Sequence, residues 1–562
     1  HLAEFSRSVN IGSKFLKERL QQLSAEGCLT ADPKAQRLGS GGGTVNALHE
    51  SWLNQRKSGG AFRDFGDWLG AEQRLILHAG GESRRLPAYA AVGKAFIPMP
   101  PASGVKPRTP MPWLADYQLP QMRQALHNLG DKARVMVASG DVWLDFDASD
   151  ISAVHSDFAG IGMRVSADVA QHFGVYFVEK SLGRRESGGA RTISFFLQKP
   201  SPAEIRRFEA KYDFYVDTGM WVLSAQAVMF LFKRCGWSEK EKLFKTKSGL
   251  PLPLDLYTEI GCALGTETKP SNALAKLGFG HLTASVVPLD AARFYHLGSS
   301  RQLLESIEEM QRHSTSIERF FCMASPADHF TVTDRSSVWI ESSQTSAPIR
   351  LGGHNLLTGL PEQSRLNFLG AGVCVDVAPV DRHSYVFRPY NIDDSYRGLP
   401  GSGGKICGRD AAEWLAARGF PRADVDVFDL PLYPVVPAAR ITQAWLDWFF
   451  AEQPDLETSR LMASLPRISA REISARVNFD RYFKQRIAGY SEQVQSEFQQ
   501  LIDAGDGRVL EQDCDALAAF CCEYAPALAD WLRKNRQAIL RALHQPELQA
   551  RAQQLFELLG DR

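Results

Sequence analysis

The stretch from Leu75 to Pro98 (LILHAGGESRRLPAYAAVGKAFIP) contains the residues best suited to chemistry. A short apolar run, typical of a buried strand, leads directly into paired glycines. Glycine lets backbone N–H groups approach an anion closely, and nearby arginine and lysine side chains supply the charge that polyphosphate needs. The sequence therefore predicts a phosphate-binding loop at the carboxyl end of a buried strand, although a glycine turn with two solvated arginines is the alternative. The candidate residues are Gly80, Gly81, Ser83, Arg84, Arg85 and Lys94.

A second glycine-rich segment, LGSGGGT, precedes an expected helix over Val45 to Trp52. Backbone amides at a helix N-terminus favour an anion or the edge of a nucleotide, so we predict a nucleotide contact here. The segment lacks the strand and acidic residue of a dinucleotide-binding fingerprint and the Gly-Lys-Ser/Thr of a P-loop. A flexible turn is the alternative. The candidate residues are Gly39, Ser40, Gly41, Gly42, Gly43 and Thr44.

An aspartate follows the next expected strand, which covers Arg134 to Ala138 and leads into Ser139-Gly140-Asp141. A carboxylate at the carboxyl tip of a buried strand, beside a phosphate loop, is well placed to hold Mg²⁺. On the tripeptide alone, a simple turn is the alternative. Asp141 is therefore the candidate metal ligand.

The composition narrows the function classes. The chain has 562 residues, 44% of them hydrophobic and 23% charged, which is typical of a globular protein with two to four domains. Lys+Arg and Asp+Glu are both 64, so neither nucleic acid nor an anionic membrane is expected as a partner. No apolar run approaches the length of about 18 residues that spans a bilayer. Nine cysteines without paired zinc-type spacing predict reduced thiols and a cytoplasmic protein.

Three regions with different patterns must position these residues. Up to about residue 321, strands and helices alternate, which predicts an α/β fold. Residues 330–378 carry short β-rich segments with polar breaks, which suggest a small β-solenoid. From residue 441 to the end, apolar and aromatic residues recur at helical spacing. We therefore expect domains at 1–325, 326–440 and 441–562, the last α-helical.

The first stretch resembles the signature loop of the sugar-nucleotide pyrophosphorylases, where alanine and paired glycines precede an arginine-leucine pair and a later lysine. The matching residues are Ala79, Gly80, Gly81, Arg85, Leu86 and Lys94. Ser83, Arg84 and Gly93 replace the glycine, threonine and proline of that pattern, which points away from the common bacterial branch. The resemblance implies a nucleotidyltransferase domain with a GT-A-like, Rossmann-type mixed sheet.

Further segments extend the resemblance in the same order. Asp141 falls on the family's metal-binding aspartate, and Lys199, in Gln-Lys-Pro, falls on a lysine that contacts the sugar phosphate. Asp217 lies in a segment like the one that lines the sugar pocket and could accept from sugar hydroxyls. His296 replaces an aspartate that is a second metal contact, and because Mg²⁺ prefers oxygen, phosphate or sugar are its alternative partners. Residues 338–361 resemble left-handed β-helix coils.

More closely, most of the chain resembles the guanylyltransferase half of bifunctional L-fucokinase/fucose-1-phosphate guanylyltransferases. The segments that carry this resemblance are LGSGGGT, LHAGGESRRLP, ASGDVWL, LQKPS, FYHLGSS, GAGVCVDVAP and RPYNIDD. It implies formation of GDP-L-fucose and pyrophosphate from GTP and L-fucose-1-phosphate, with Mg²⁺ as cofactor. No glycine-rich kinase motif is present in the sequence, so we expect that a fused fucokinase domain is absent from this chain.

The resemblance also implies roles for individual residues. Arg85 and Lys94 would hold the triphosphate, Asp141 would hold Mg²⁺ at the α-phosphate, and Lys199 would orient the sugar phosphate. Two alternatives stay open at this point. The substrate could be another sugar-1-phosphate, such as that of a heptose, or the chain could be a non-catalytic module like the regulatory subunits of an initiation-factor exchange complex.

Overall fold

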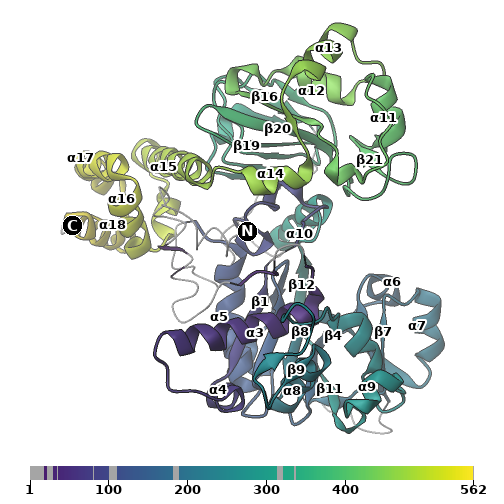
Figure 1. The fold of residues 1–562 in the computed structure, drawn as a ribbon. Coiled ribbons are helices and arrows are strands. Elements are labelled where there is room, and N and C mark those ends of the chain that lie inside the picture. The colour runs from purple at the N-terminus through teal and green to yellow at the C-terminus, as the bar shows by residue number, and fades with distance from the viewer. Residues whose placement is uncertain are drawn as a thin grey trace.

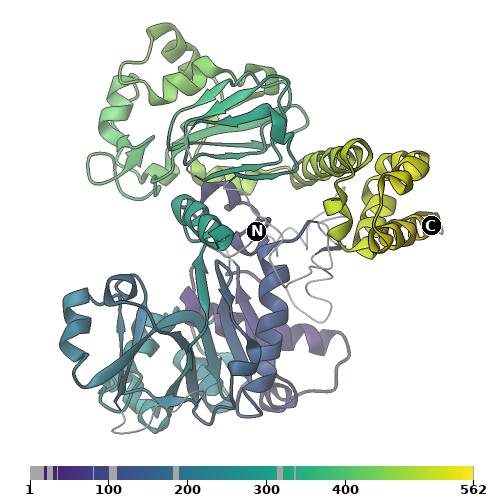
Figure 2. The ribbon, with the colours of Figure 1, turned by 180° about the vertical axis from the view of Figure 1, so that it is seen from behind.

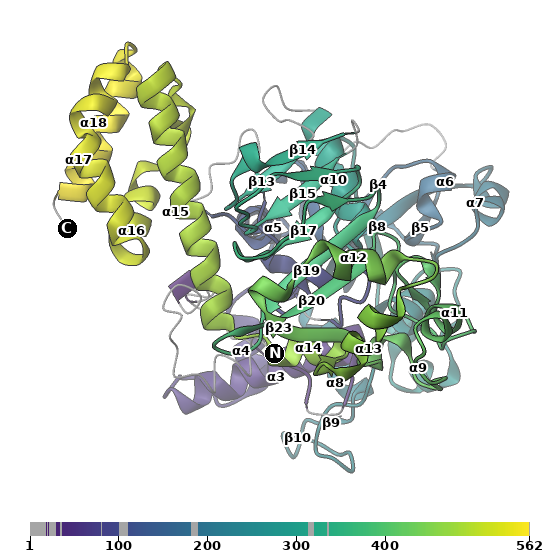
Figure 3. The same ribbon diagram turned by 90° about the horizontal axis from the view of Figure 1, so that it is seen from above.

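The computed structural model describes residues 18, 19, 21, 30–33, 36–79, 81–99, 111–180, 189–312, 320–333 and 337–560. These residues form a first unit around a mixed sheet, a second unit around another sheet, and a group of helices that stands to one side (Figures 1 and 3). Across this described part of the chain, no helix combines the length and apolar character needed to cross a membrane.

The first unit contains an eight-stranded sheet of order β1-β2-β8-β4-β11-β6, in which β5 pairs with β7 and β8. Its strands are β1 (Arg74–His78), β2 (Val135–Ser139), β4 (Phe158–Met163), β5 (Gly174–Glu179), β6 (Arg191–Thr192), β7 (Phe195–Gln198), β8 (Tyr212–Leu223) and β11 (Ala284–Leu289). Strands β1 and β2 are parallel, whereas β8 is antiparallel to both β2 and β4. The predicted α/β fold with a mixed sheet is therefore confirmed.

Helices cover both faces of this sheet (Figures 1 and 2). The helices of the first unit are α3 (Gly39–Lys57), α4 (Phe65–Ala71), α5 (Leu114–Asn128), α6 (Ala167–Ala170), α7 (Pro202–Phe208), α8 (Ala225–Arg234) and α9 (Asn272–Lys276). Side chains of α3 and α8 share one apolar core with Val135 and Val137 of β2, whereas α5 packs on Met136 from the other face. This alternation along β2 follows from the two-residue repeat of a strand.

Short elements complete the first unit. They are the ribbon of β3 (Val142–Asp145) and β12 (Arg293–His296), the ribbon of β9 (Trp237–Ser238) and β10 (Leu243–Phe244), and helix α10 (Ser300–Arg312). Helix α10 lies between the two units (Figure 2). The chain therefore passes directly from the β3–β12 ribbon, at the edge of the first unit, toward the second.

In the second unit, successive strands alternate between two parallel sheets. One sheet holds β13 (Phe320–Met323), β15 (Val338–Glu341), β17 (Leu356–Thr358) and β19 (Val373–Pro379); the other holds β14 (Phe330–Val332), β16 (Ile349–Leu351) and β18 (Phe368–Leu369). After β19 the pairing becomes antiparallel. A tight turn causes the reversal, because the Asp381 carboxylate accepts from the amides of His383 and Ser384.

The later part of the second unit thus departs from the solenoid that the sequence suggested over residues 326–440. Its strands are β20 (Ser384–Asn391), β21 (Lys405–Ile406), β22 (Arg409–Asp410), β23 (Tyr433–Pro437) and β24 (Arg467–Ile468). Its helices are α11 (Ala411–Ala417), α12 (Gln443–Phe450), α13 (Leu456–Ser464) and α14 (Ala470–Arg476). The first three of these helices lie around the second sheet rather than with the C-terminal helices (Figure 1).

The C-terminal helices form a separate group that projects to one side (Figure 3). They are α15 (Phe479–Ala504), α16 (Cys514–Tyr524), α17 (Pro526–Ala542) and α18 (Pro546–Gly560). The long α15 connects this group to the second unit, because its first turns bury Phe479, Tyr482 and Phe483 in the shared core. The helical character predicted after residue 441 is present, but it is divided between two places in the fold.

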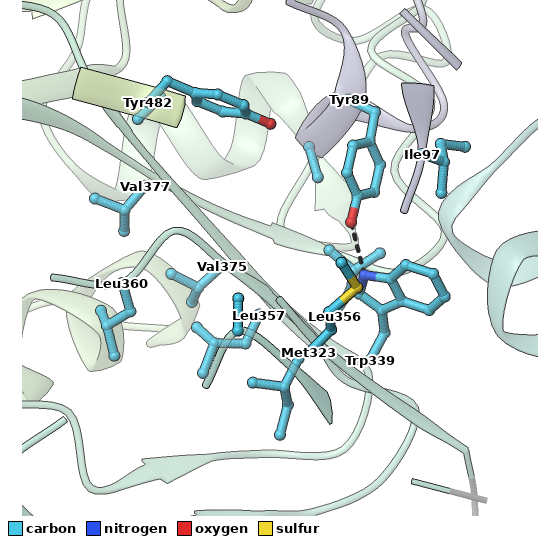
Figure 4. Close-up of a cluster of buried hydrophobic side chains, with 14 of the residues drawn as sticks. Tyr89, Ile97, Met323, Trp339, Leu356, Leu357, Leu360, Val375, Val377 and Tyr482 are labelled. Carbon is cyan, nitrogen blue, oxygen red and sulfur yellow. Dashed lines mark hydrogen bonds between the residues drawn. The ribbon is translucent and has the colours of Figure 1, made fainter. Parts of the chain in front are cut away.

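One apolar core joins the two units. Tyr89 and Ile97, which follow the predicted phosphate loop, pack against Trp339 and other side chains of the parallel strands (Figure 4). The Trp339 indole N–H donates to the Tyr89 hydroxyl at 2.7 Å. The segment after the phosphate loop therefore packs against the second unit as well as the first.

Two buried ion pairs reinforce this junction. Arg388 pairs with Asp376 and also donates to the carbonyl of Pro87 at 2.7 Å. Arg486 of α15 pairs with Glu341 of β15 at 2.6 Å, and both side chains are buried. Burial raises the pKa of Glu341, against the opposing charge of Arg486. A buried pair of this kind is costly to break, because the remaining partner becomes an uncompensated charge.

We predict that Arg486→Met destabilises the protein by about 3 to 5 kcal/mol, since it leaves Glu341 buried without its counter-charge. The double variant Arg486→Met with Glu341→Met removes both charges and should recover most of that loss. Urea denaturation of the full chain, compared by transition midpoint, checks the order. If the single variant is as stable as the double variant, the pair does not have this role.

Candidate active site

Three polar side chains meet beside the β3–β12 ribbon. The Lys94 ammonium donates to Asp141 Oδ2 at 2.9 Å and to the carbonyl of Gly298 at 3.1 Å. His296 Nε2 lies 3.8 Å from the same carboxylate oxygen. The antiparallel register causes this convergence, because His296 lies opposite Val142, the residue after Asp141. With Arg85, described below, these three residues form what we call the charged cluster.

The Asp141 carboxylate is held in its ionised form. Burial by itself would raise its pKa, but the adjoining His296 ring and the Lys94 ammonium outweigh burial and hold the pKa well below its usual range. The Ser139 hydroxyl also donates to Asp141 Oδ1 at 2.5 Å. The carboxylate is thus an anion in a setting that offers it cations and donors, which suits a group that must attract charge at neutral pH.

Arg85 lies on the same side of the molecule as Asp141. Its carbonyl accepts from the Ser300 amide at 2.8 Å, while the Asp141 carbonyl accepts from the Leu297 amide at 2.8 Å. The Arg85 side chain is exposed and, within the described residues, makes no hydrogen bond or ion pair. The surrounding protein and then the like charge of Arg397 lower its pKa, against the attraction of Asp141. The structure therefore places the backbone of Arg85 near the Lys94–Asp141 pair, and the binding roles of these three residues stay predictions.

The backbone of Lys199 is linked to His296 of the cluster through Phe173. Its amide donates to the carbonyl of Phe173 at 2.9 Å, and the Phe173 ring lies edge-on to His296 at 6.0 Å between centroids. The side chain of Lys199 is exposed, and its backbone has φ of 53°. This left-handed conformation is uncommon for a residue with a Cβ and often marks a functional position.

Asp217 occupies a different setting from the one predicted. It is 5% exposed, and its oxygens accept from the Gly219 amide at 2.9 Å and the Trp221 indole at 2.8 Å. Burial raises its pKa to about 6. Each carboxylate oxygen of Asp217 already accepts a hydrogen bond from within the protein, so a structural role explains its position. Its contact with sugar hydroxyls stays a prediction.

Tyr257 is a residue that the sequence analysis did not identify as part of the site. Burial raises its pKa above the usual range, and the charges of Asp217 and Asp141 raise it further. Its hydroxyl therefore stays protonated at neutral pH. The local sequence indicates only a helix cap: the Asp255 side chain accepts from the amides of Tyr257 and Thr258. This pattern does not distinguish Tyr257 as a site residue.

The second glycine segment requires a correction. Helix α3 begins at Gly39, not at Val45, and the amides of Gly41 and Gly42 both donate to the carbonyl of Leu254 at 2.9 and 3.1 Å. A Cβ at Gly39 or Gly41 would lie 2.7 Å from atoms of Leu254. These glycines allow close helix packing, and the two amides are not free to bind an anion.

The remaining polar residues of this segment also have partners. The Ser40 hydroxyl accepts from the Leu256 amide at 2.8 Å, and the Thr44 hydroxyl lies 3.0 Å from Nε2 of the partly buried His78. Burial lowers the pKa of His78. The nucleotide contact predicted for residues 39–44 therefore stays a prediction, with Gly43 and Thr44 at its side nearest to β1.

The first loop divides its residues between two roles. Gly80 lies outside the described residues, while Gly81 has φ of 142° and Ser83 has φ of 45°. The Arg84 guanidinium donates to Glu82 at 2.6 Å and to Asp426 of the second unit at 3.0 Å. Arg84 thus connects the loop to the second unit. Its guanidinium group is paired with carboxylates, whereas the sequence predicted a contact with the nucleotide.

A metal ion would find only a partial site in the protein itself. Within the described residues, no group of three or more His, Cys, Asp or Glu side chains could enclose one. Asp141 is the one carboxylate of the charged cluster, and Mg²⁺ is often held by one or two carboxylates together with substrate phosphates and water. If Mg²⁺ binds here, Asp141 would supply one carboxylate ligand, and a bound phosphate and water would have to supply the others.

Comparison with known proteins agrees with this geometry. Residues 66–431 match the family described as the fucose pyrophosphorylase domain. The chain is 32% identical to L-fucokinase/L-fucose-1-P guanylyltransferase of Bacteroides fragilis, over 81% of this chain and 48% of that protein. It is 22% identical to bifunctional fucokinase/GDP-fucose pyrophosphorylase of Arabidopsis thaliana, over 80% of this chain and 47% of that protein. With fucose-1-phosphate guanylyltransferase of Mus musculus it shares 25% identity, over 52% of each chain. The chain thus spans about half the length of these relatives.

The setting of Asp217 predicts a pH dependence of stability. Its pKa is about 6 in the folded protein against 3.8 ordinarily, so the folded state binds the proton more tightly. Stability from this group is complete below pH 3.8 and is lost as the pH rises to about 6, by about 3 kcal/mol in all.

The variant Asp217→Asn lacks this titration while its amide oxygen can still accept hydrogen bonds. The free energy of unfolding of wild type minus that of the variant should therefore fall by about 2.4 kcal/mol between pH 4 and pH 7, because part of the total is already lost at pH 4. Urea titrations at intermediate pH values check this. Asp424→Asn, which changes an exposed carboxylate, is the control. The prediction is contradicted if the free energy of unfolding of Asp217→Asn depends on pH in the same way as that of wild type.

Proposed function

This chain belongs to the fucose pyrophosphorylase domain family, and we propose that it transfers a guanylyl group from GTP to L-fucose-1-phosphate. The observation that carries the proposal is the charged cluster. In it, Lys94 lies 2.9 Å from an ionised Asp141, and the nearby Arg85 side chain makes no hydrogen bond or ion pair with a described residue. A binding module that only retained the fold would not need this grouping. The names of the relatives support guanine and fucose as the substrate groups.

In the proposed reaction, a phosphate oxygen of L-fucose-1-phosphate attacks the α-phosphorus of GTP. The bond between the α-phosphorus and the bridging oxygen breaks, and pyrophosphate leaves. The nucleophile is already an anion at neutral pH, so no general base is required. The task of the protein is to align two anions and to offset their charge.

The residues of the site divide this task. Arg85 and Lys94 hold the triphosphate, and Lys94 can move from Asp141 to a phosphate oxygen without leaving the cluster. Lys199 orients the sugar phosphate from the side of Phe173, and His296 is a further donor to phosphate or sugar. Asp141 would hold Mg²⁺, whose other ligands would be phosphate oxygens and water; when bound, the ion supplies Lewis-acid stabilisation of the α-phosphate.

Other features of the chain support finer proposals. We interpret the alternating parallel strands of residues 320–379 as the coils of a short β-solenoid. We propose that the nucleotidyltransferase unit ends near the expected boundary at residue 325. The boundary expected near residue 440 falls within the second unit, whose last helix, α14, ends at Arg476. Because two relatives are named as fucokinases as well, we propose that the reaction works with a fucokinase, fused or separate, in the cytoplasm.

The reaction can be tested with purified protein, Mg²⁺ and a panel of substrates. Four nucleoside triphosphates are combined with fucose-1-phosphate, mannose-1-phosphate and a heptose-1-phosphate, and pyrophosphate release is measured. We expect the highest kcat/KM for GTP with fucose-1-phosphate. A preference for another sugar would change the substrate, and no release from any pair would leave the chain as a binding module.

Two substitutions test the roles of the cluster. Arg85→Ala and Asp141→Asn should each lower kcat by about 10²- to 10³-fold, because each removes charge stabilisation present in the transition state. The fold should survive in both, as judged by circular dichroism and thermal unfolding. Arg207→Ala, on the exposed side of α7, is the matched control, and turnover equal to this control in both variants would refute the assigned roles.

A further inference from the structure

A turn of the second unit is tied to the elements that carry the charged cluster. Asp393 pairs with Arg301 of α10, with N–O distances of 2.5 and 2.7 Å. The carbonyl of Tyr396 accepts from the Arg84 guanidinium at 3.1 Å. Both partners are sequence neighbours of the cluster, since Arg84 precedes Arg85 and α10 directly follows the Leu297–Ser299 segment. The turn at residues 393–398 is therefore fixed beside the active site.

The backbone of this turn is held in an uncommon conformation around one residue, Arg397. Tyr396 has φ of 48° and Gly398 has φ of 96°. Tyr396 is buried, with its hydroxyl 2.8 Å from that of Tyr433, and the Gly398 amide donates to Asp426 at 3.3 Å. The left-handed conformation of a large residue such as Tyr396 costs free energy and persists only when its surroundings hold it in place.

The result of this arrangement is an exposed arginine between two anchored residues. Asp426, which accepts from both Arg84 and Gly398, connects the turn to the phosphate loop. The side chain of Arg397 is exposed and, like that of Arg85, makes no hydrogen bond or ion pair with any described residue. Contacts within the described residues therefore do not explain why the guanidinium group of Arg397 is placed here.

Arg397 and Arg85 lie on adjoining segments, because the residue before Arg85 donates to the carbonyl of the residue before Arg397 at 3.1 Å. In agreement with this, burial and then the like charge of Arg397 lower the pKa of Arg85. Asp141, the one carboxylate of the charged cluster, already pairs with Lys94. Two guanidinium groups that the fold holds near one another favour an anion that can bridge them, because planar guanidinium forks match phosphate oxygens.

We propose that Arg397 is a phosphate-binding residue of the active site and that it shares with Arg85 the β- and γ-phosphates that leave as pyrophosphate. This inference rests on the proposed function. Arg397 enters from the side of the phosphate loop, whereas Lys199 and His296 lie together on the side of Phe173. The triphosphate end therefore belongs to Arg85 and Arg397, and the site is composed of residues from both units.

The test compares Arg397→Ala and Arg397→Lys with wild type. Binding of inorganic pyrophosphate with Mg²⁺, measured by calorimetry, should weaken at least tenfold in Arg397→Ala and less in Arg397→Lys, which keeps the charge. In turnover assays, Arg397→Ala should raise KM for GTP and lower kcat, with KM for the sugar phosphate unchanged. Arg422→Ala, an exposed arginine of the same unit, is the control for loss of surface charge.

A double-variant cycle with Arg85→Ala distinguishes a shared anion from two separate effects. If both residues bind one pyrophosphate, the loss in Arg85→Ala with Arg397→Ala should differ from the product of the single losses. Pyrophosphate binding in Arg397→Ala equal to that in the Arg422→Ala control would overturn the inference. Because that assay needs no sugar substrate, weakened binding in a chain that never forms GDP-fucose would refute the proposed function and leave this inference standing.

Discussion

The contact between Lys94 and Asp141 is the interaction on which the site depends. A carboxylate largely removed from water stays ionised only if cations and donors compensate for its lost hydration. Lys94, Ser139 and His296 provide that compensation, and three separate segments of the chain must meet for them to do so. In the proposed function, Lys94 would bind a substrate phosphate, and Asp141 would hold the metal ion, which would supply Lewis-acid chemistry.

The meeting of these segments requires both units. The residues after the phosphate loop are buried against the strands of the second unit, where Trp339 donates to Tyr89 and Arg388 donates to the carbonyl of Pro87. On the other side, Arg84 and Glu82 connect the loop to Asp426 and Arg471. The loop is thus held from both ends, and the second unit acts as part of the scaffold of the active site.

Neighbouring arginines in one motif have different uses here. Arg84 is half-buried and joined to Glu82 and Asp426, so its charge is spent on holding the loop. Arg85, one residue later, is exposed and has its charge available for a ligand. The glycines at 39, 41 and 42 likewise have a structural use, because they permit helix α3 to pack closely on Leu254. Residue type alone could not assign these roles, since the contacts of Arg84 with Asp426 and of the glycines with Leu254 join residues more than 200 positions apart in the chain.

The sequence by itself determined the strand of β1, the order of the candidate residues, the mixed α/β character of the first unit and the family resemblance, because these depend on local periodicity and on short motifs. Tertiary structure decided which candidates carry an available charge. The contact of Arg84 with Asp426, the approach of His296 to Asp141, and the place of Arg397 beside Arg85 all follow from long-range packing. No local pattern records such contacts, since they form only when distant segments are brought together by burial of a common core.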